Sequence, residues 1–305
     1  MAKVSIITVN FRQGAYTLDF LKSLRSTRYQ DLEVIVVENG WIEDMDSLYE
    51  EAYPSTKIIH SKENLGFAGG NNLGIQEATG DYIFFLNNDT EVHPETVNHL
   101  VEEMKKDKSL GVICPRIYYY DQPEMLQYAG YTPMNWFTAQ NQVNHYKKSV
   151  ELEDRVEVTA FAHGAAMMVS RDAINKTGLM HENYFLYYEE LDWVHRINKR
   201  GYGVKVHHGA YVLHKESVST GKGSPLKTYF QTRNRILFMR RNAGARRWIF
   251  FLFFLLAVLP KHLLTYLLAK KWEHAKSLLA GAWWNLRHST TSNEIGYLYD
   301  KLRFS

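Results

Sequence analysis

The feature of this sequence that most limits its fold is an alternation of short, mainly apolar segments with segments of helical periodicity. Nearly continuous apolar runs are typical of parallel strands, which are covered on both faces of their sheet. The apolar runs lie at residues 4–9, 32–37, 57–59, 82–86 and 112–114. Three segments of helical pattern lie between them: one at 16–25, one that opens at 66–74, and one that ends at about residue 105. This alternation predicts an α/β protein with three layers around a parallel sheet.

The second half of the chain is patterned differently. Residues 118–145 are rich in turn formers and aromatic side chains, and residues 184–200 have a strong helical pattern. Strand-like segments lie at 161–170, 203–206 and 210–213. No internal repeat or low-complexity linker separates the halves, so we expect one compact domain followed by a C-terminal tail.

Composition narrows the class of protein further. The 305 residues are 45% hydrophobic and 23% charged, which supports a sizeable core and excludes global disorder. A single cysteine, Cys114, excludes a disulfide framework and a cysteine-rich metal site. The first three residues lead directly into the first apolar strand without a secretory signal, so a reduced, cytoplasmic compartment is expected.

The net charge of +3 conceals a basic tail. From Arg233 onward the sequence has 13 Lys and Arg residues against three Asp and Glu residues, whereas the preceding part is acidic. An acidic body with a basic tail indicates an anionic partner for the tail, either lipid headgroups or nucleic acid.

An apolar stretch lies between the basic clusters of this tail. It covers residues 248–259, is interrupted by residues 260–262 (Pro-Lys-His), and resumes over 263–269. Either half is shorter than the about 20 apolar residues that cross a bilayer, and together they would make a poor spanning helix. Flanking Arg, Lys and Trp residues favour an amphipathic helix that lies on an anionic membrane or dips into it. A buried core helix is the alternative, and nucleic acid is not expected as a partner because no face interleaves basic and aromatic residues.

Polar residues follow the predicted strands at the points where these strands end. Asn10, Glu38, Asn64 and residues 87–89 (Asn-Asn-Asp) all directly follow or closely trail apolar runs. In open α/β sheets ligands bind beyond the carboxyl ends of the strands. The glycine-rich segment 64–72 would admit a phosphate or a ribose close to the start of a helix.

Motifs for several other functions are absent. The glycine-rich segment matches neither the phosphate-binding loop that ends in Lys-Ser/Thr nor the Gly-x-Gly-x-x-Gly fingerprint, which argues against an ATPase and a dehydrogenase. The lack of a Gly-x-Ser-x-Gly elbow weakens the case for a serine hydrolase.

Candidate chemistry lies at several acids and one histidine. Asp89 could hold a divalent cation together with phosphate oxygens and water, or could cap a helix. His214 ends a strand and could supply a nitrogen ligand or be structural. Glu189, Glu190 and Asp192 crowd three carboxylates into four positions; their repulsion would raise at least one pKa and suit a general base, although acids also favour helix starts.

Several motifs in order resemble inverting glycosyltransferases of family 2, most closely bacterial rhamnosyltransferases that build cell-surface polysaccharides. The similarity covers about residues 3–242. The motifs lie at residues 4–10, 36–39, 63–71, 85–90, 164–167 and 185–201, and a further element at 229–235 is similar.

The resemblance implies a GT-A fold, which is a Rossmann-like three-layer α/β/α arrangement with a mixed sheet, here followed by C-terminal amphipathic, membrane-associated helices. It implies a nucleotide-sugar-binding half over residues 1–115, an acceptor-binding and catalytic half over 116–232, and a membrane-associated tail over 233–305. It also implies a divalent cation, Mn²⁺ or Mg²⁺.

The resemblance assigns roles to individual residues. Residues 87–89 stand in place of the family's Asp-x-Asp motif, so Asp89 is expected to hold the metal, and His214, before residues 217–221, to contact the metal or diphosphate. Glu190 corresponds to the second acid of a Glu-Asp pair and is the expected base, with Asp192 as runner-up. The residues expected to bind the donor are Thr8, Asn10, Glu38, Asn64, Asn71, Asn88, Arg233 and Arg235.

The implied activity is hexosyl transfer with inversion at the cytoplasmic face of the cell membrane, by a peripherally bound enzyme. The expected donor is dTDP-rhamnose and the expected acceptor is a lipid-linked or growing glycan. Three alternatives remain: another donor such as a UDP-sugar, a degenerate nucleotide-sugar-binding scaffold of a synthesis complex, and a nucleotidyltransferase that releases pyrophosphate.

Overall fold

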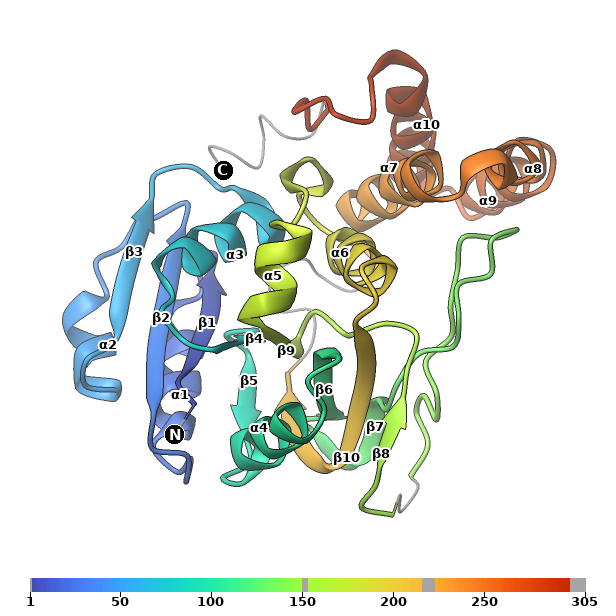
Figure 1. Ribbon diagram of the computed structural model, residues 1–305. Coiled ribbons are helices and arrows are strands. Elements are labelled where there is room, and N and C mark those ends of the chain that lie inside the picture. The colour runs from blue at the N-terminus through green and yellow to red at the C-terminus, as the bar shows by residue number, and fades with distance from the viewer. Residues whose placement is uncertain (1, 150–152, 216–222, 297–305) are drawn as a thin grey trace.

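The computed structural model describes residues 2–149, 153–215 and 223–296. These residues form one mixed sheet of ten strands with helices against both of its faces, and a group of tail helices at one end (Figure 1). The α/β fold with a mixed sheet between two layers of helices, as predicted from the sequence, is therefore confirmed. The expected segment 217–221 and the last part of the tail, 297–305, lie outside the described residues.

The strands combine parallel and antiparallel pairing. The sheet order is β3-β2-β1-β4-β9-β6-β10-β5, with β7 beside β6 and β8 beside β10. The strands are β1 (Val4–Asn10), β2 (Leu32–Asn39), β3 (Lys57–Ser61), β4 (Tyr82–Leu86), β5 (Thr90–Val92), β6 (Leu110–Tyr119), β7 (Gln122–Tyr128), β8 (Val156–Val158), β9 (Ala166–Ser170) and β10 (Gly203–His214).

Two features of strand register bring the predicted site residues together. The parallel pairing of β1 with β2 sets Asn10 opposite Glu38. The antiparallel pairing of β10 with β5 sets His214 opposite Thr90, directly after Asp89. Residues that are more than 120 positions apart in the chain thus meet at one edge of the sheet.

Several strand and helix boundaries differ from the sequence prediction. The strand predicted at 112–114 continues through Pro115, and the two segments predicted at 203–206 and 210–213 are one strand, β10, with a bulge between them. Proline and bulge residues interrupt the apolar pattern without ending a strand. The turn-rich segment 118–145 contains β7, and the strand predicted over 161–170 begins only at Ala166.

The helices of the body connect these strands. They are α1 (Gly14–Leu24), α2 (Asp46–Ala52), α3 (Gly66–Glu77), α4 (Thr96–Lys106), α5 (Arg171–Thr177), the 3₁₀ turn η1 (Glu182–Tyr184) and α6 (Glu189–Lys199). The helix predicted over 184–200 begins only at Glu189, because Phe185, Tyr187 and Tyr188 have φ angles of 64°, 69° and 73°. These left-handed values exclude the residues from a helix.

The tail is helical almost throughout its described part. It comprises α7 (Pro225–Asn242), η2 (Gly244–Arg246), α8 (Arg247–Phe253), the π-helical η3 (Phe254–Val258), α9 (Leu259–Leu268) and α10 (Trp272–Arg287). Helices α7 and α10 pack along each other, whereas α8 and α9 project beyond the body (Figure 1).

The apolar stretch of the tail forms one continuous helix over residues 244–268. These 25 residues include an 18-residue window with a mean hydropathy of 1.9, of which only 11% is buried. By length and composition this helix could cross a membrane, so the division into two short halves at Pro260 was wrong. The π-helical turn just before Pro260 changes the hydrogen-bond register where the proline lacks an N–H. The alternative of a buried core helix is also wrong, because most of the window is exposed.

The start of α3 requires glycine for two separate reasons. Gly66 has a φ of +70°, and a Cβ atom built there would lie 2.2 Å from the carbonyl oxygen of Phe185. The same carbonyl accepts a 2.7 Å hydrogen bond from the backbone N–H of Phe67. The glycine-rich segment therefore provides close contact with the turn before α6, in addition to any contact with a ligand.

A matched pair of variants separates these two reasons. Gly201 has a φ of +91° with nothing near its Cβ position, so Gly201→Ala should cost only the left-handed penalty of about 1–2 kcal/mol. Gly66→Ala adds a backbone collision, so its total cost should reach about 3 kcal/mol or more. Urea unfolding measures both. Equal losses of stability would show that the contact with Phe185 is dispensable.

Candidate active site

A cavity of about 580 Å³ lies at the carboxyl ends of β1, β2 and β4. Its wall also includes residues from the turn before α6, the end of β10 and the start of α7. The predicted site residues among those that line it are Asn64, Asn88, Asp89, Glu190 and His214. The other predicted site residues are Thr8, Asn10, Glu38, Asn71, Asp192, Arg233 and Arg235, and none of them lines this cavity.

Asp89 and His214 form a buried polar pair at the base of the cavity. Nε2 of His214 lies 3.1 Å from Oδ1 of Asp89, and both side chains are more than 90% buried. Nδ1 of His214 lies 2.8 Å from Oε1 of Gln127. Because an amide oxygen only accepts hydrogen bonds, Gln127 places a proton on Nδ1 and turns Nε2 toward Asp89. Asp89 precedes β5 and caps no helix, so the capping alternative is wrong.

This pair fits a divalent cation bound jointly with a ligand. Oδ1 of Asp89 is buried and accepts no hydrogen bond in the part of the chain that the structure describes. A carboxylate oxygen and an imidazole nitrogen suit Mn²⁺, and Mg²⁺ binds through one or two carboxylates plus phosphate oxygens and water. Among the described residues, no group of three or more His, Cys, Asp or Glu side chains could hold a metal alone. A phosphate-bearing ligand would therefore have to complete the coordination.

Asn10 and Glu38 form a supporting layer behind the cavity wall. Nδ2 of Asn10 donates to both carboxylate oxygens of Glu38 at 2.9 Å, and the Tyr49 hydroxyl donates to Oε1 at 2.7 Å. Burial raises the pKa of Glu38, while these hydrogen bonds oppose that rise. Asn88, which does line the cavity, donates to Oδ1 of Asn10 at 3.0 Å. The structure thus connects Glu38 to the cavity through Asn10 and Asn88.

Of the other donor-binding residues predicted in the first half of the chain, one lines the cavity and two do not. Asn64 lines the cavity and accepts hydrogen bonds from Asn39 Nδ2 and the Gly66 N–H at 3.1 and 2.9 Å. Asn71 instead donates within α3 to the carbonyl of Phe67. Thr8 is buried in β1, where its hydroxyl has no hydrogen-bond partner among the described residues.

Glu189 and Glu190 begin α6 but have different surroundings. Burial raises the pKa of Glu190 to about 7, and its side chain lines the cavity. Glu189 is buried away from the cavity, and its pKa is raised well above the usual value by burial and by the charge of Glu190. A carboxylate with a pKa near neutrality that faces a cavity is suited to take up a proton.

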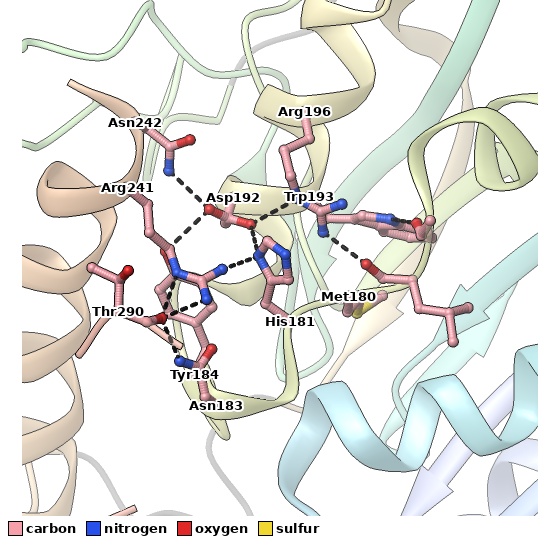
Figure 2. Close-up of polar contacts among 12 residues, drawn as sticks. Met180, His181, Asn183, Tyr184, Asp192, Trp193, Arg196, Arg241, Asn242 and Thr290 are labelled. Carbon is pink, nitrogen blue, oxygen red and sulfur yellow. Dashed lines mark hydrogen bonds and ion pairs between the residues drawn. The ribbon is translucent and has the colours of Figure 1, made fainter. Parts of the chain in front are cut away.

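Asp192 is held in a separate network on another side of α6 (Figure 2). Oδ2 lies 2.8 Å from Nδ1 of His181 and 2.9 Å from Nε of Arg196, while Oδ1 accepts hydrogen bonds from Tyr184 and Asn242. Although burial opposes it, these hydrogen bonds and the Arg196 charge hold the pKa of Asp192 far below its usual range. The carboxylate is ionised and fully engaged, so its geometry suits structural support and not proton transfer.

Arg233 and Arg235 are buried in α7 and donate to backbone carbonyls. Arg233 donates to the carbonyls of Asn183 and Tyr184, and its guanidinium lies 4.1 Å from the centroid of the Trp284 ring. Arg235 donates to the carbonyl of Thr138 at 2.7 Å. The expectation that these arginines lie beside a diphosphate at this cavity does not match their position.

The structure brings other residues to the cavity that sequence reasoning missed. Lys227 in the first turn of α7 is the one Lys or Arg side chain among the described lining residues. The other missed polar and aromatic lining residues include Gln127, Tyr131, His163, Tyr188 and Gln231. A lysine two residues after a proline at a helix start gave no signal of its own, because nothing in the local pattern shows that α7 begins at the cavity.

Comparison with known proteins decides the family. A family model described as glycosyl transferase family 2 matches residues 5–178, which is more than half of the chain. The chain belongs to this family. The resemblance noted from the ordered sequence motifs is thereby confirmed.

Two relatives are similar over most of their length. The low-salt glycan biosynthesis hexosyltransferase Agl10 of Haloferax volcanii is 25% identical over 239 residues, which cover 77% of this chain and 74% of the relative. The N-acetylglucosaminyl-diphospho-decaprenol L-rhamnosyltransferase of Mycobacterium tuberculosis is 22% identical over 237 residues, which cover 71% of this chain and 77% of the relative.

Solved structures share the fold at low sequence identity. GalNAc-T7, solved with UDP, GalNAc and Mn²⁺, aligns with a TM-score of 0.66 at 15% identity over 82% of this chain and 50% of its own. The mannosyltransferase PcManGT of Pyrobaculum calidifontis, solved with GDP-Man and Mn²⁺, aligns with a TM-score of 0.57 at 14% identity over 93% of this chain and 87% of its own. The present chain thus spans about half of GalNAc-T7.

Proposed function

We propose that this glycosyltransferase moves L-rhamnose from dTDP-rhamnose to a hydroxyl group of a lipid-linked or growing glycan, with inversion at the anomeric carbon. The main support for this proposal is that two kinds of group line the same cavity. The Asp89–His214 pair suits a cation, and Glu190 suits a base. The name of the mycobacterial relative supports the choice of donor and of a lipid-linked acceptor.

Glu190 acts as the general base in the proposed reaction. Its ionised carboxylate accepts the proton of the acceptor hydroxyl while that oxygen attacks the anomeric carbon. The bond from this carbon to the diphosphate oxygen breaks as the new glycosidic bond forms, and the nucleoside diphosphate leaves. Of the two carboxylates among the described lining residues, Asp89 is assigned to the cation, so Glu190 is left as the base, and a single displacement without a covalent intermediate inverts the configuration.

Asp89 and His214 would hold Mn²⁺ or Mg²⁺. When bound, the cation neutralises negative charge that develops on the departing diphosphate. The role of the chain is to present the two ligands at fixed spacing, with Gln127 orienting the imidazole from behind. Lys227 supplies a further positive charge at the cavity wall for the phosphates of the donor or the acceptor lipid.

A panel of nucleotide sugars tests the assignment. Purified enzyme with Mn²⁺ or Mg²⁺ should release nucleoside diphosphate from dTDP-rhamnose faster than from UDP-sugars or GDP-mannose when a polyprenyl-diphosphate glycan is present. Asp89→Asn should lower kcat by about 100-fold or more and weaken the dependence on the metal, because one ligand loses its charge. Asp172→Asn, at an exposed ion pair on α5, is the control and should be neutral.

Two results would contradict this assignment. Unchanged turnover in Asp89→Asn would show that Asp89 is not a ligand of a metal needed for the reaction. Nucleotide binding without transfer to any acceptor supports the alternative of a non-catalytic scaffold, and pyrophosphate release from a nucleoside triphosphate supports a nucleotidyltransferase.

The raised pKa of Glu190 predicts the pH dependence of the reaction. Only the ionised carboxylate accepts a proton, so kcat should rise with pH through about 7 and then level off. Glu190→Gln should lower kcat by about 100- to 10,000-fold and remove this limb. Glu77→Gln, at an exposed pair with Lys57, is the matched control. Near-normal turnover in Glu190→Gln, or a limb near pH 4 in the wild type, would exclude Glu190 as the base.

The tail helices offer a docking surface for the cytoplasmic face of an anionic membrane. On α8 and η3 one side packs on the body through the buried Phe250 and Phe254, while Trp248, Leu252 and Leu256 are each more than 60% exposed, and no residue of α9 is buried. Arg and Lys side chains flank this helix at both ends. One packed side and one exposed apolar side favour a helix that lies at the membrane interface. Docking there would concentrate the enzyme beside a lipid-linked acceptor.

Sedimentation with vesicles tests this membrane surface. The full-length protein should pellet with anionic vesicles at low salt, and the double variant Leu252→Glu/Leu256→Glu should bind about 100-fold more weakly, because two exposed leucine side chains can no longer be buried in the membrane. Val158→Glu, at an 83% exposed site on β8, should bind as the wild type does. Equal pelleting of the wild type, the double leucine variant and Val158→Glu would show that this surface does not bind the membrane. Retention in membranes after alkaline extraction would instead indicate a spanning helix.

A further inference from the structure

The turn that precedes Glu189 and Glu190 has an unusual backbone. Phe185, Tyr187 and Tyr188 are large aromatic residues with positive φ angles, and no side chain caps the start of α6 at Tyr188. Residues with side chains rarely keep such conformations unless their surroundings impose them. The contacts that impose this turn therefore also determine where Glu190 points.

Asn234, in the middle of α7, supplies the densest of these contacts. Its Nδ2 atom lies 2.8 Å from each of three carbonyl oxygens, those of Tyr184, Leu186 and Tyr187, which share its two N–H donors. The side chain is fully buried. One amide group thus gathers three carbonyls of the irregular turn, which could not be satisfied by helix or sheet partners.

Arg233 fixes the orientation of this amide. Its Nη1 atom donates to Oδ1 of Asn234 at 2.8 Å, while Nη2 donates to the carbonyl of Asn183 at 2.6 Å. Arginine is only a donor and a carbonyl only an acceptor, so Oδ1 must face Arg233 and Nδ2 must face the turn. The pair Arg233–Asn234 is therefore a single unit that holds residues 183–187.

We propose that Asn234 is a positioning residue for the transfer reaction: it holds the 184–188 turn so that Glu190 faces the acceptor hydroxyl, with Arg233 orienting its amide. This inference rests on the proposed role of Glu190. It makes α7 part of the catalytic apparatus, because the same helix contributes Lys227 and Gln231 to the cavity and leads into the membrane-docking helices.

The competing explanation is that Asn234 only stabilises the packing of α7 against the turn before α6, without any effect on Glu190. The chain offers a control for this case in Asn285 of α10, which is 7% exposed. Its Nδ2 atom donates to the carbonyls of Arg233 and Gly281 at 2.9 and 3.1 Å, but it makes no contact with the turn. Both asparagines have the same chemistry and similar burial, and only one touches the segment before Glu190.

The test compares Asn234→Asp with Asn285→Asp in the full-length protein. The isosteric carboxylate of Asn234→Asp cannot donate and repels the three carbonyls, so the turn should shift. We expect kcat to fall about 100-fold, as for a displaced catalytic group, with the KM for the donor within about threefold of the wild-type value. The acidic limb of kcat should also move below about pH 7, because Glu190 loses part of its burial. Asn285→Asp should change neither quantity by more than about threefold.

Hydrogen–deuterium exchange supplies a readout that needs no substrate. The amides of residues 183–192 should exchange faster in Asn234→Asp than in Asn285→Asp, with the strands of the sheet unchanged. If Asn234→Asp does not fold, Asn234→Ser, which retains a single donor, is measured in its place and should show the same changes to a smaller degree.

The outcomes separate this inference from the proposed function. Normal kcat and normal exchange in the Asn234 variant, or equal losses in both asparagine variants, would overturn the positioning role. Near-normal turnover in Glu190→Gln combined with faster exchange in Asn234→Asp would show that Asn234 holds the turn but that Glu190 is not the base, which also overturns the inference.

Discussion

The backbone carbonyls of residues 183–187 are the point at which three parts of this molecule meet. The carbonyl of Phe185 accepts a hydrogen bond from the start of α3, and those of its neighbours accept hydrogen bonds from Asn234 and Arg233 of α7. Because Gly66 has no side chain, α3 can approach this turn directly. Helix α3, the start of α6 and the tail helix α7 are thus tied together through main-chain atoms of one left-handed turn. Few substitutions at the turn itself would break these bonds, whereas changes in the residues that donate to it would.

The sequence predicted the sheet well because strands of this kind carry a strong local signal. Apolar runs identified β1 to β4, and the polar residues that end them include Asn64, Asn88 and Asp89, which do line the cavity. His214 was also placed correctly beside Asp89, since it ends a strand at the same edge of the sheet. The exact set of residues that reach the cavity was harder to predict. Glu38 and Asn10 end their strands at the expected level, yet they bond to each other one layer behind the wall.

The basic residues of α7 show why buried charge misleads sequence reasoning. An arginine near a predicted phosphate site suggests a contact with the anion, but Arg233 and Arg235 both satisfy carbonyls in segments distant along the chain. Irregular turns leave carbonyls that only tertiary partners can satisfy, and no local pattern reveals which side chain will do so. The same limit applies to the tail helix. Pro260 suggested a break, whereas a π-helical turn absorbs it and the helix continues.

The acids of α6 illustrate how helix geometry separates residues that are adjacent in the sequence. Glu190 and Asp192 are two positions apart, which places their side chains about 200° apart around the helix axis. Glu190 consequently faces the cavity, where burial raises its pKa, and Asp192 faces His181, Arg196 and α7, where donors lower its pKa. Burial raises the pKa values of Glu189 and Glu190, and the charge of Glu190 adds to the rise at Glu189, whereas the pKa of Asp192 is lowered. Both acids are linked to α7. Asp192 accepts a hydrogen bond from Asn242 near the end of α7, and Asn234 of the same helix holds the turn before Glu190. Helix α6 is therefore attached to α7 on both sides of Glu190.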